Sequence, residues 1–230
     1  MSTGLLQAIG ILVWAGLCSA DQRAVASRQI HQPIVAAVVT GLIFGAPERA
    51  LPVGLWLQLV WPTPMPIGGA LLPDTGSAAI AASLVALAVP GGEGFLIAIL
   101  FGLLVAWFTI PWERRLRRAN GAREERALAA RGKGLTGAIA LGVGGPFLRG
   151  MVAAGAGLMF ARYVGGWIEP LPRTPVLGLL TKSLIGGAGA LGLAGLLARV
   201  QRETGRTWFS WVSAGLLIGA AGRFLIEVSR

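Results

Sequence analysis

Apolar runs separated by short polar turns make up most of the chain, and these runs differ in length. The longer runs lie at about residues 4–20, 94–112, 135–148, 151–168, 175–197 and 208–226. A helix needs roughly 20 predominantly apolar residues to cross a bilayer core, so the longest runs predict membrane-spanning helices. We therefore expect an all-α, polytopic transmembrane protein whose residues 1–230 form a single membrane-embedded domain.

Three apolar runs are shorter. One lies between Pro33 and Phe44, and the other two cover residues 51–61 and 77–89. As a helix, the run at 51–61 extends about 16 Å, roughly half of the thickness of a bilayer core. Together the runs at 51–61 and 77–89 predict a discontinuous or re-entrant pair of segments.

The stretch at residues 57–74 reads LQLVWPTPMPIGGALLPD and connects two of the short runs. Proline removes a backbone donor and glycine is a weak helix former, so a dense mixture of the two breaks a helix. The residues concerned are Pro62, Pro64, Pro66, Gly68 and Gly69. Transporters place broken helices of this kind at their substrate sites, which predicts a substrate site here.

Composition and charge support a membrane protein. Charged residues are 13% of the chain, about half the share of soluble domains, which is roughly 25%. The net charge is +10, and eight of the 20 basic residues lie between Arg114 and Lys133. A basic block between apolar spans follows the positive-inside rule, so residues 113–134 are predicted to be a cytoplasmic surface helix near lipid headgroups. This distribution argues against nucleic-acid binding.

Asp74 and Gln58 are the main candidates for ligand contacts, and each has a structural alternative. The Asp74 carboxylate can accept hydrogen bonds from sugar hydroxyls, or it can cap the helix that begins near Gly76. The Gln58 amide suits a polyhydroxyl ligand because it both donates and accepts without a charge. Its alternative role is a hydrogen bond between helices.

Three further ionisable residues are candidates for a polar pathway: Asp21, Arg149 and Lys182. Charges inside membrane segments are costly and usually have partners, so Arg149 or Lys182 is expected either to pair with Asp74 or to line a polar cavity. The alternative for Arg149 is a boundary between two spans, because Gly144, Gly145 and Pro146 precede it. Asp21 and His31 either line a vestibule or belong to a solvated turn.

The candidate residues do not match the pattern of an enzyme. His31 is the single histidine, and it has no partner serine and carboxylate in a recognisable triad order. No cluster of ligand-type residues has metal-site spacing, and no glycine-rich phosphate loop is recognisable. We therefore predict no catalytic residue, metal or cofactor.

The segments HQPIVAAVVTGLIFG (residues 31–45) and LQLVWPTPMPIGGALLPD (residues 57–74) resemble the IIC subunit of the mannose, fructose and sorbose type of sugar phosphotransferase system. The resemblance implies a sugar permease that is not itself an enzyme. It also implies substrate contacts at Gln58 and Asp74 and along the backbone of the connecting segment, at Ile67, Gly68, Gly69 and Ala70.

The same resemblance implies partners and a location. A IIC subunit associates with a membrane IID subunit, and the IIC/IID units form trimers. Cytoplasmic IIA and IIB subunits carry the phosphoryl group, and IIB phosphorylates the translocated sugar. The expected location is the inner (cytoplasmic) membrane of a bacterial cell, as a multi-pass protein. Pro66 stands where the family often has asparagine, which favours an alternative function, a non-transporting receptor or regulatory membrane protein that retains the IIC fold.

Overall fold

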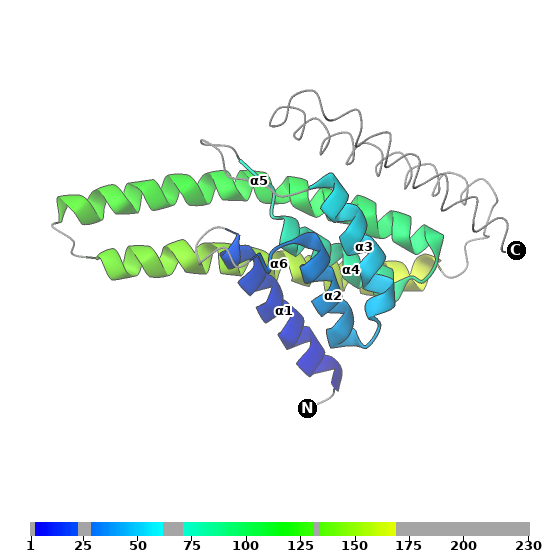
Figure 1. Cartoon of the computed structure of the whole chain (residues 1–230). Helices are drawn as coiled ribbons and strands as arrows, with labels where there is room; N and C mark the ends of the chain where they lie inside the picture. The colour runs from blue at the N-terminus through cyan, green and yellow to red at the C-terminus, as the bar shows by residue number, and fades with distance from the viewer. Residues whose placement is uncertain (1–2, 23–28, 62–70, 131–133, 169–230) are drawn as a thin grey trace, which may run out of the picture.

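The computed structural model describes residues 3–22, 29–61, 71–130 and 134–168, and most of these residues are helical (Figure 1). The helices of the described part are α1 (Thr3–Asp21), α2 (Pro33–Phe44), α3 (Pro47–Val60), α4 (Thr75–Ala88), α5 (Gly92–Ala129) and α6 (Leu135–Ile168). The all-helical class is confirmed. The apolar runs predicted at 175–197 and 208–226 lie outside the described residues.

Helix α4 is the centre of the bundle and contacts all five other described helices. Every residue from Thr75 to Ala86 is buried. Most of these residues are small, so neighbouring backbones approach closely, and Ile80, Leu84 and Val85 fill the remaining space. A helix that is apolar on all sides is typical of a fully enclosed position.

Helices α2, α3 and α4 are short, with 12, 14 and 14 residues. At 1.5 Å per residue they extend about 18–21 Å, less than the roughly 30 Å of a bilayer core. The turn between α2 and α3 is tight because Gly45 adopts a left-handed conformation, with φ of 73°, and Pro47 begins α3 at once. The prediction of short segments on both sides of residues 61–74 is confirmed.

Helices α5 and α6 are long, with 38 and 34 residues, and they form a hairpin that extends beyond the other helices in Figure 1. Helix α5 continues through Pro111 and past residue 112, the predicted end of a span, into the basic segment that was predicted to be a surface helix. The end of the membrane span at residue 112 stays a prediction. The basic segment is rich in Ala, Arg, Glu and Leu, which are strong helix formers. Its proposed cytoplasmic location stays a prediction.

The predicted boundary between runs 135–148 and 151–168 is wrong, because α6 is continuous through Pro146 and Arg149. Of the two glycines that suggested a break, Gly145 is a packing position, and Gly150, just after Arg149, is another. A Cβ atom on Gly145 would lie 2.7 Å from Leu116 of α5, and one on Gly150 would collide with the carbonyl oxygen of Ala15 in α1. Glycine at these positions allows α5 and α1 to approach α6 closely.

Three described helices are long and apolar enough to cross a membrane: Gly4–Asp21, Gly92–Ala129 and Leu135–Trp167. Two shorter apolar helices accompany them, Pro33–Phe44 and Thr75–Ala88. Together with the short α3, this arrangement confirms a polytopic membrane fold.

Candidate functional site

The site begins at the N-terminus of α4, which Asp74 caps. The Asp74 carboxylate accepts a hydrogen bond from the backbone N–H of Ser77 at 3.1 Å. The backbone N–H of Asp74 donates to the hydroxyl of Thr109 at 2.9 Å, and that hydroxyl donates to the carbonyl of Ala106 at 2.6 Å. The capping role that the sequence offered as an alternative is confirmed, and it fixes Asp74 against α5.

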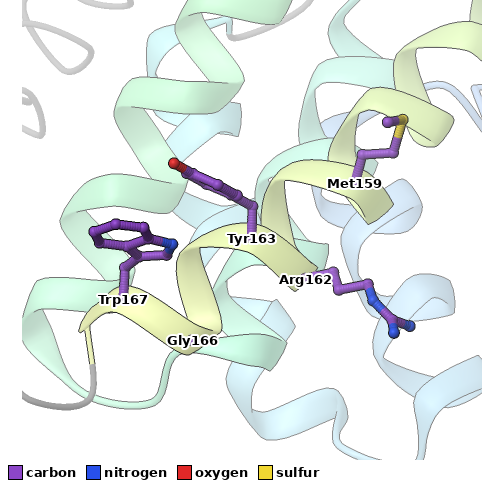
Figure 2. A pocket seen from close by; sticks show the side chains of 5 residues that line it. All are labelled: Met159, Arg162, Tyr163, Gly166 and Trp167. Carbon is purple, nitrogen blue, oxygen red and sulfur yellow. The ribbon is translucent and has the colours of Figure 1, made fainter.

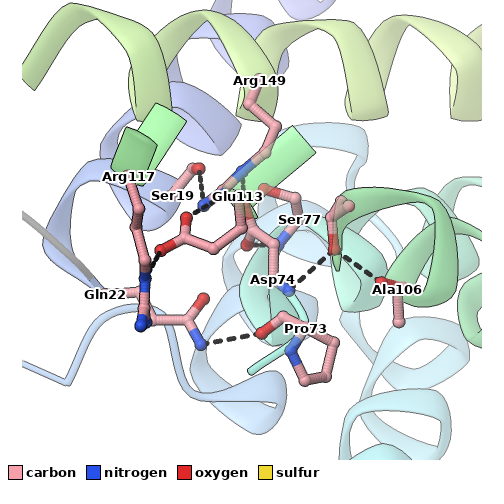
Figure 3. Close-up of polar contacts among 10 residues, drawn as sticks. Ser19, Gln22, Pro73, Asp74, Ser77, Ala106, Glu113, Arg117 and Arg149 are labelled. Atoms are coloured by element: carbon pink, nitrogen blue, oxygen red, sulfur yellow. Dashed lines mark hydrogen bonds and ion pairs between the residues drawn. The ribbon is translucent and has the colours of Figure 1, made fainter. Parts of the chain in front are cut away.

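Arg149 of α6 joins Asp74 to two other helices (Figure 3). Its Nε donates to Asp74 Oδ2 at 3.1 Å, its Nη1 to Glu113 Oε2 at 2.6 Å, and its Nη2 to the hydroxyl of Ser19 at 3.1 Å. Arg149 is 1% exposed and Asp74 is fully buried. The predicted pairing of Arg149 with Asp74 is confirmed, whereas the alternative that Arg149 marks a span boundary is wrong.

Glu113 extends the network along α5. Its second carboxylate oxygen, Oε1, accepts from Nε of Arg117 at 2.8 Å, one helical turn further on. The four side chains Asp74, Glu113, Arg117 and Arg149 thus bring two negative and two positive charges together. A buried ion is costly unless it is paired and hydrogen-bonded, and this balance makes the cluster tolerable inside a membrane protein.

Ser19, Thr109 and Glu113 belong to the site although the sequence did not identify them. Glu113 was predicted to be part of an exposed basic segment, but it is 4% exposed. The available signal was its spacing of four residues from Arg117, which favours a pair along one helix face. Ser19 and Thr109 carried no signal, because a lone hydroxyl inside an apolar run has many possible roles.

Gln58 lies on α3 and contacts the start of α2. Its amide oxygen accepts from the backbone N–H of Ile34, and its amide nitrogen donates to the carbonyl of Trp61, both at 3.4 Å. This is the hydrogen bond between helices that the sequence offered as an alternative. The role of Gln58 in binding sugar stays a prediction. Residues 67–70 and Lys182 lie outside the described residues.

Asp21 and His31 form a pair beside the network, with 2.8 Å between Asp21 Oδ2 and His31 Nδ1. Asp21 is 4% exposed, so the alternative of a solvated position is wrong for this residue. The cause is the packing of the turn before α2 against α4. A Cβ atom on Gly76 would lie 2.9 Å from the carbonyl oxygen of His31, so only glycine permits this approach.

One cavity borders the network, and a second hollow lies apart from it. A cavity of about 300 Å³ between α5 and α6 reaches Arg149 and Thr109 at one end. A more open hollow of about 500 Å³ lies near the C-terminal end of α6, where Tyr163 and Trp167 pack with ring centroids 5.7 Å apart (Figure 2). No group of three His, Cys, Asp or Glu residues that could hold a metal ion occurs within the described ranges.

Comparison with known proteins identifies the family. The model of the EII-Sor family, described as the sorbose-specific IIC component of the PTS system, matches residues 5–197. A solved chain titled "Structure of membrane protein" is similar with a TM-score of 0.68 and 21% sequence identity, covering 99% of this chain and 95% of that chain. At this identity the likeness concerns the fold alone. A comparison with curated proteins finds no match. The chain therefore belongs to the family of sorbose-specific IIC components of the phosphotransferase system.

Proposed function

We propose that the chain is the IIC permease subunit of a mannose-type phosphotransferase system and translocates a sugar that a partner IIB subunit phosphorylates. Membership in the sorbose-type IIC family supports a membrane component of sugar transport. We further propose that cytoplasmic IIA and IIB subunits carry the phosphoryl group and that the chain associates with a membrane IID subunit. In this proposal the IIC/IID units form trimers in the inner membrane of a bacterial cell.

The position of the buried network carries the proposal of a sugar site. Asp74 follows directly after the connection between α3 and α4, and Arg149 brings α1, α5 and α6 to the same point. A carboxylate has about four acceptor positions. Ser77 and Arg149 use two of those on Asp74, so the same carboxylate has the capacity to accept hydrogen bonds from sugar hydroxyls.

Sugar-dependent phosphorylation in membrane vesicles tests the proposal, with cognate IIA, IIB and IID subunits added. We expect Asp74→Asn and Gln58→Leu each to weaken sugar binding about tenfold, because a hydrogen bond contributes about 1–2 kcal/mol and 1.4 kcal/mol corresponds to a factor of ten. Gln7→Leu is the matched control, since Gln7 bonds the carbonyl of Ile43 between α1 and α2. Unchanged binding and uptake in both site variants would show that the site assignment is wrong.

The alternative, a non-transporting receptor or regulatory membrane protein with the IIC fold, is favoured by one observation. Both oxygens of Asp74 already have protein partners, which suits a structural role for this carboxylate. The same vesicles distinguish the two functions. A permease yields sugar phosphate on the IIB side, whereas a receptor binds sugar and yields none.

A further inference from the structure

We propose that the cavity between α5 and α6 is a binding site for one acyl chain of a glycerophospholipid, with an ester carbonyl of the lipid at Arg149 and its phosphate at Arg115. The proposal is independent of the sugar-transport function. It depends on the shape of the cavity, the unused donors of Arg149, and the depth of the site in the membrane.

The cavity has the shape and lining of an acyl-chain groove. Its volume is about 300 Å³, at the lower end of the range of small-ligand pockets. The floor is formed by buried Val105 and Ala153, whereas the walls are Leu104, Phe108 and Val152, which are 47%, 60% and 48% exposed. Half-exposed apolar walls over a buried apolar floor, within membrane-spanning helices, form a groove that opens toward lipid.

The two ends of the groove differ in chemistry. At one end lie the buried side chains of Arg149 and Thr109. A guanidinium has five N–H groups. Three of those on Arg149 donate to Asp74, Glu113 and Ser19, and the other two have no acceptor among the described residues. At the other end Phe101 stacks on Phe160 with centroids 4.1 Å apart and closes the groove. A ligand with an oxygen at one end and an apolar body fits this polarity.

The polar end lies at the depth of the membrane interface. Arg149 bonds Glu113, which directly follows Trp112 and precedes the exposed Arg114 and Arg115. Tryptophan followed by arginine is typical of an interface. From Arg149 to Trp167, the aromatic residue near the far end of α6, the helix rises about 27 Å, close to the roughly 30 Å of a hydrocarbon core. The groove therefore runs inward from the interface, as an acyl chain does.

Arg115 distinguishes a phospholipid from a free fatty acid. Groove-lining positions on α5 recur every four residues at Leu104, Phe108 and Trp112. Residues three or four apart share a helix face, so Arg115, three residues after Trp112, continues this face toward the interface, and it is exposed. Arg114 lies on the opposite face at the same depth. In a glycerophospholipid the phosphate lies closer to water than the ester carbonyl does. Arg115 lies closer to water than Arg149 in the same way, so it is placed to bind this phosphate.

Native mass spectrometry of the purified full chain tests the proposal, with photo-crosslinking by a phosphatidylglycerol that carries a diazirine on its acyl chain. We expect one retained phospholipid and crosslinks within residues 104–112 and 149–156. Ala156→Phe fills the groove from an exposed position. It should reduce retention about tenfold, the effect of losing roughly two buried methylene groups. Met159→Phe, exposed on the same helix outside this cavity, should change nothing.

Headgroup specificity is tested by Arg115→Gln and its matched control Arg114→Gln. We expect only Arg115→Gln to lower phospholipid retention, and a diazirine derivative of palmitic acid to crosslink poorly. The proposal is overturned if wild-type protein retains no phospholipid, if palmitic acid labels the groove as well as phosphatidylglycerol does, or if each variant and its control behave alike. Should Ala156→Phe not fold, the wild-type crosslink map and the arginine pair still decide the question.

Discussion

Arg149 is the residue on which the interior of the described bundle depends most. Among the described residues it is the largest fully buried side chain, and its three nitrogen atoms reach α1, α5 and the N-terminal cap of α4. A planar guanidinium presents donors in fixed directions, which a lysine ammonium does not. One side chain can therefore set the relative position of three helices around its own.

Replacement of Arg149 by methionine should lower the free energy of unfolding by about 3–5 kcal/mol, because two buried carboxylates lose a partner. Arg149→Lys should recover only part of this loss, since lysine restores the charge but not the planar set of N–H donors that a guanidinium presents. Unfolding in mixed detergent micelles measures both effects. Arg118→Met is the control, because Arg118 lies outside the network and substitutions at such positions usually stay within about 0.5 kcal/mol. Equal stability of Arg149→Met and wild type would contradict the role of the network.

Helix α6 shows why glycine and proline are ambiguous signals in a membrane protein. In water, Gly144, Gly145 and Pro146 would predict the end of a helix. In α6 the helix continues through all three residues, and Gly145 gives space for the side chain of Leu116 in α5. Small residues of this kind are typical of membrane helix interfaces. Gly150 packs against the backbone of Ala15, one residue after Arg149, so the close contact with α1 and the hydrogen bond to Ser19 depend on each other.

The substitution Gly150→Ala should separate α1 from α6, because the added methyl group meets backbone that cannot move aside. Overpacking of this kind costs about 1–3 kcal/mol. Gly155→Ala on the same helix is the matched control, since its Cβ would meet only the side chain of Leu12 at 3.9 Å. This control should be neutral or more stable by up to about 1 kcal/mol, owing to better helix propensity. Thermal unfolding of both variants checks the prediction, which fails if the two variants lose stability equally.

For the whole molecule, the α5–α6 hairpin extends the bundle and carries the basic segment. Along α5, the rise from Gly92 to Ala129 is about 56 Å, nearly twice the roughly 30 Å of a bilayer core. The distal half, with its arginines, therefore extends beyond the hydrocarbon region. The positive-inside rule predicts that this half is cytoplasmic.

Cysteine labelling tests this orientation, because the chain has one native cysteine and Cys18 is fully buried. We expect Arg126→Cys, at an exposed position, to react with a membrane-impermeant maleimide in inside-out vesicles and not in right-side-out vesicles. Wild-type protein should stay unlabelled and serves as background. Met159→Cys should also stay unlabelled, because the bilayer shields it. Labelling of Arg126→Cys in right-side-out vesicles would mean that the hairpin lies on the other side.

The sequence alone predicted the membrane class, the short segments around the break, and the family, because hydropathy and local residue order carry these properties. The length of an apolar run limits what a helix can cross, and proline and glycine density marks where a helix stops locally. The capping role of Asp74 was among the sequence predictions for the same reason. An N-cap side chain bonds a backbone N–H within the first turn of its own helix, so neighbouring residues are enough to indicate it.

Tertiary structure decided which polar groups meet. Ser19 and Arg149 are 130 positions apart in sequence, and Asp74 and Arg149 are 75 apart. No local pattern links such residues, and their contacts exist only because small residues let α1, α4 and α6 pack closely. The continuity of α5 and α6 through Pro111 and Pro146 was settled in the same way. Burial and ion pairing along these two helices stabilise the continuous form by more than proline and glycine destabilise it.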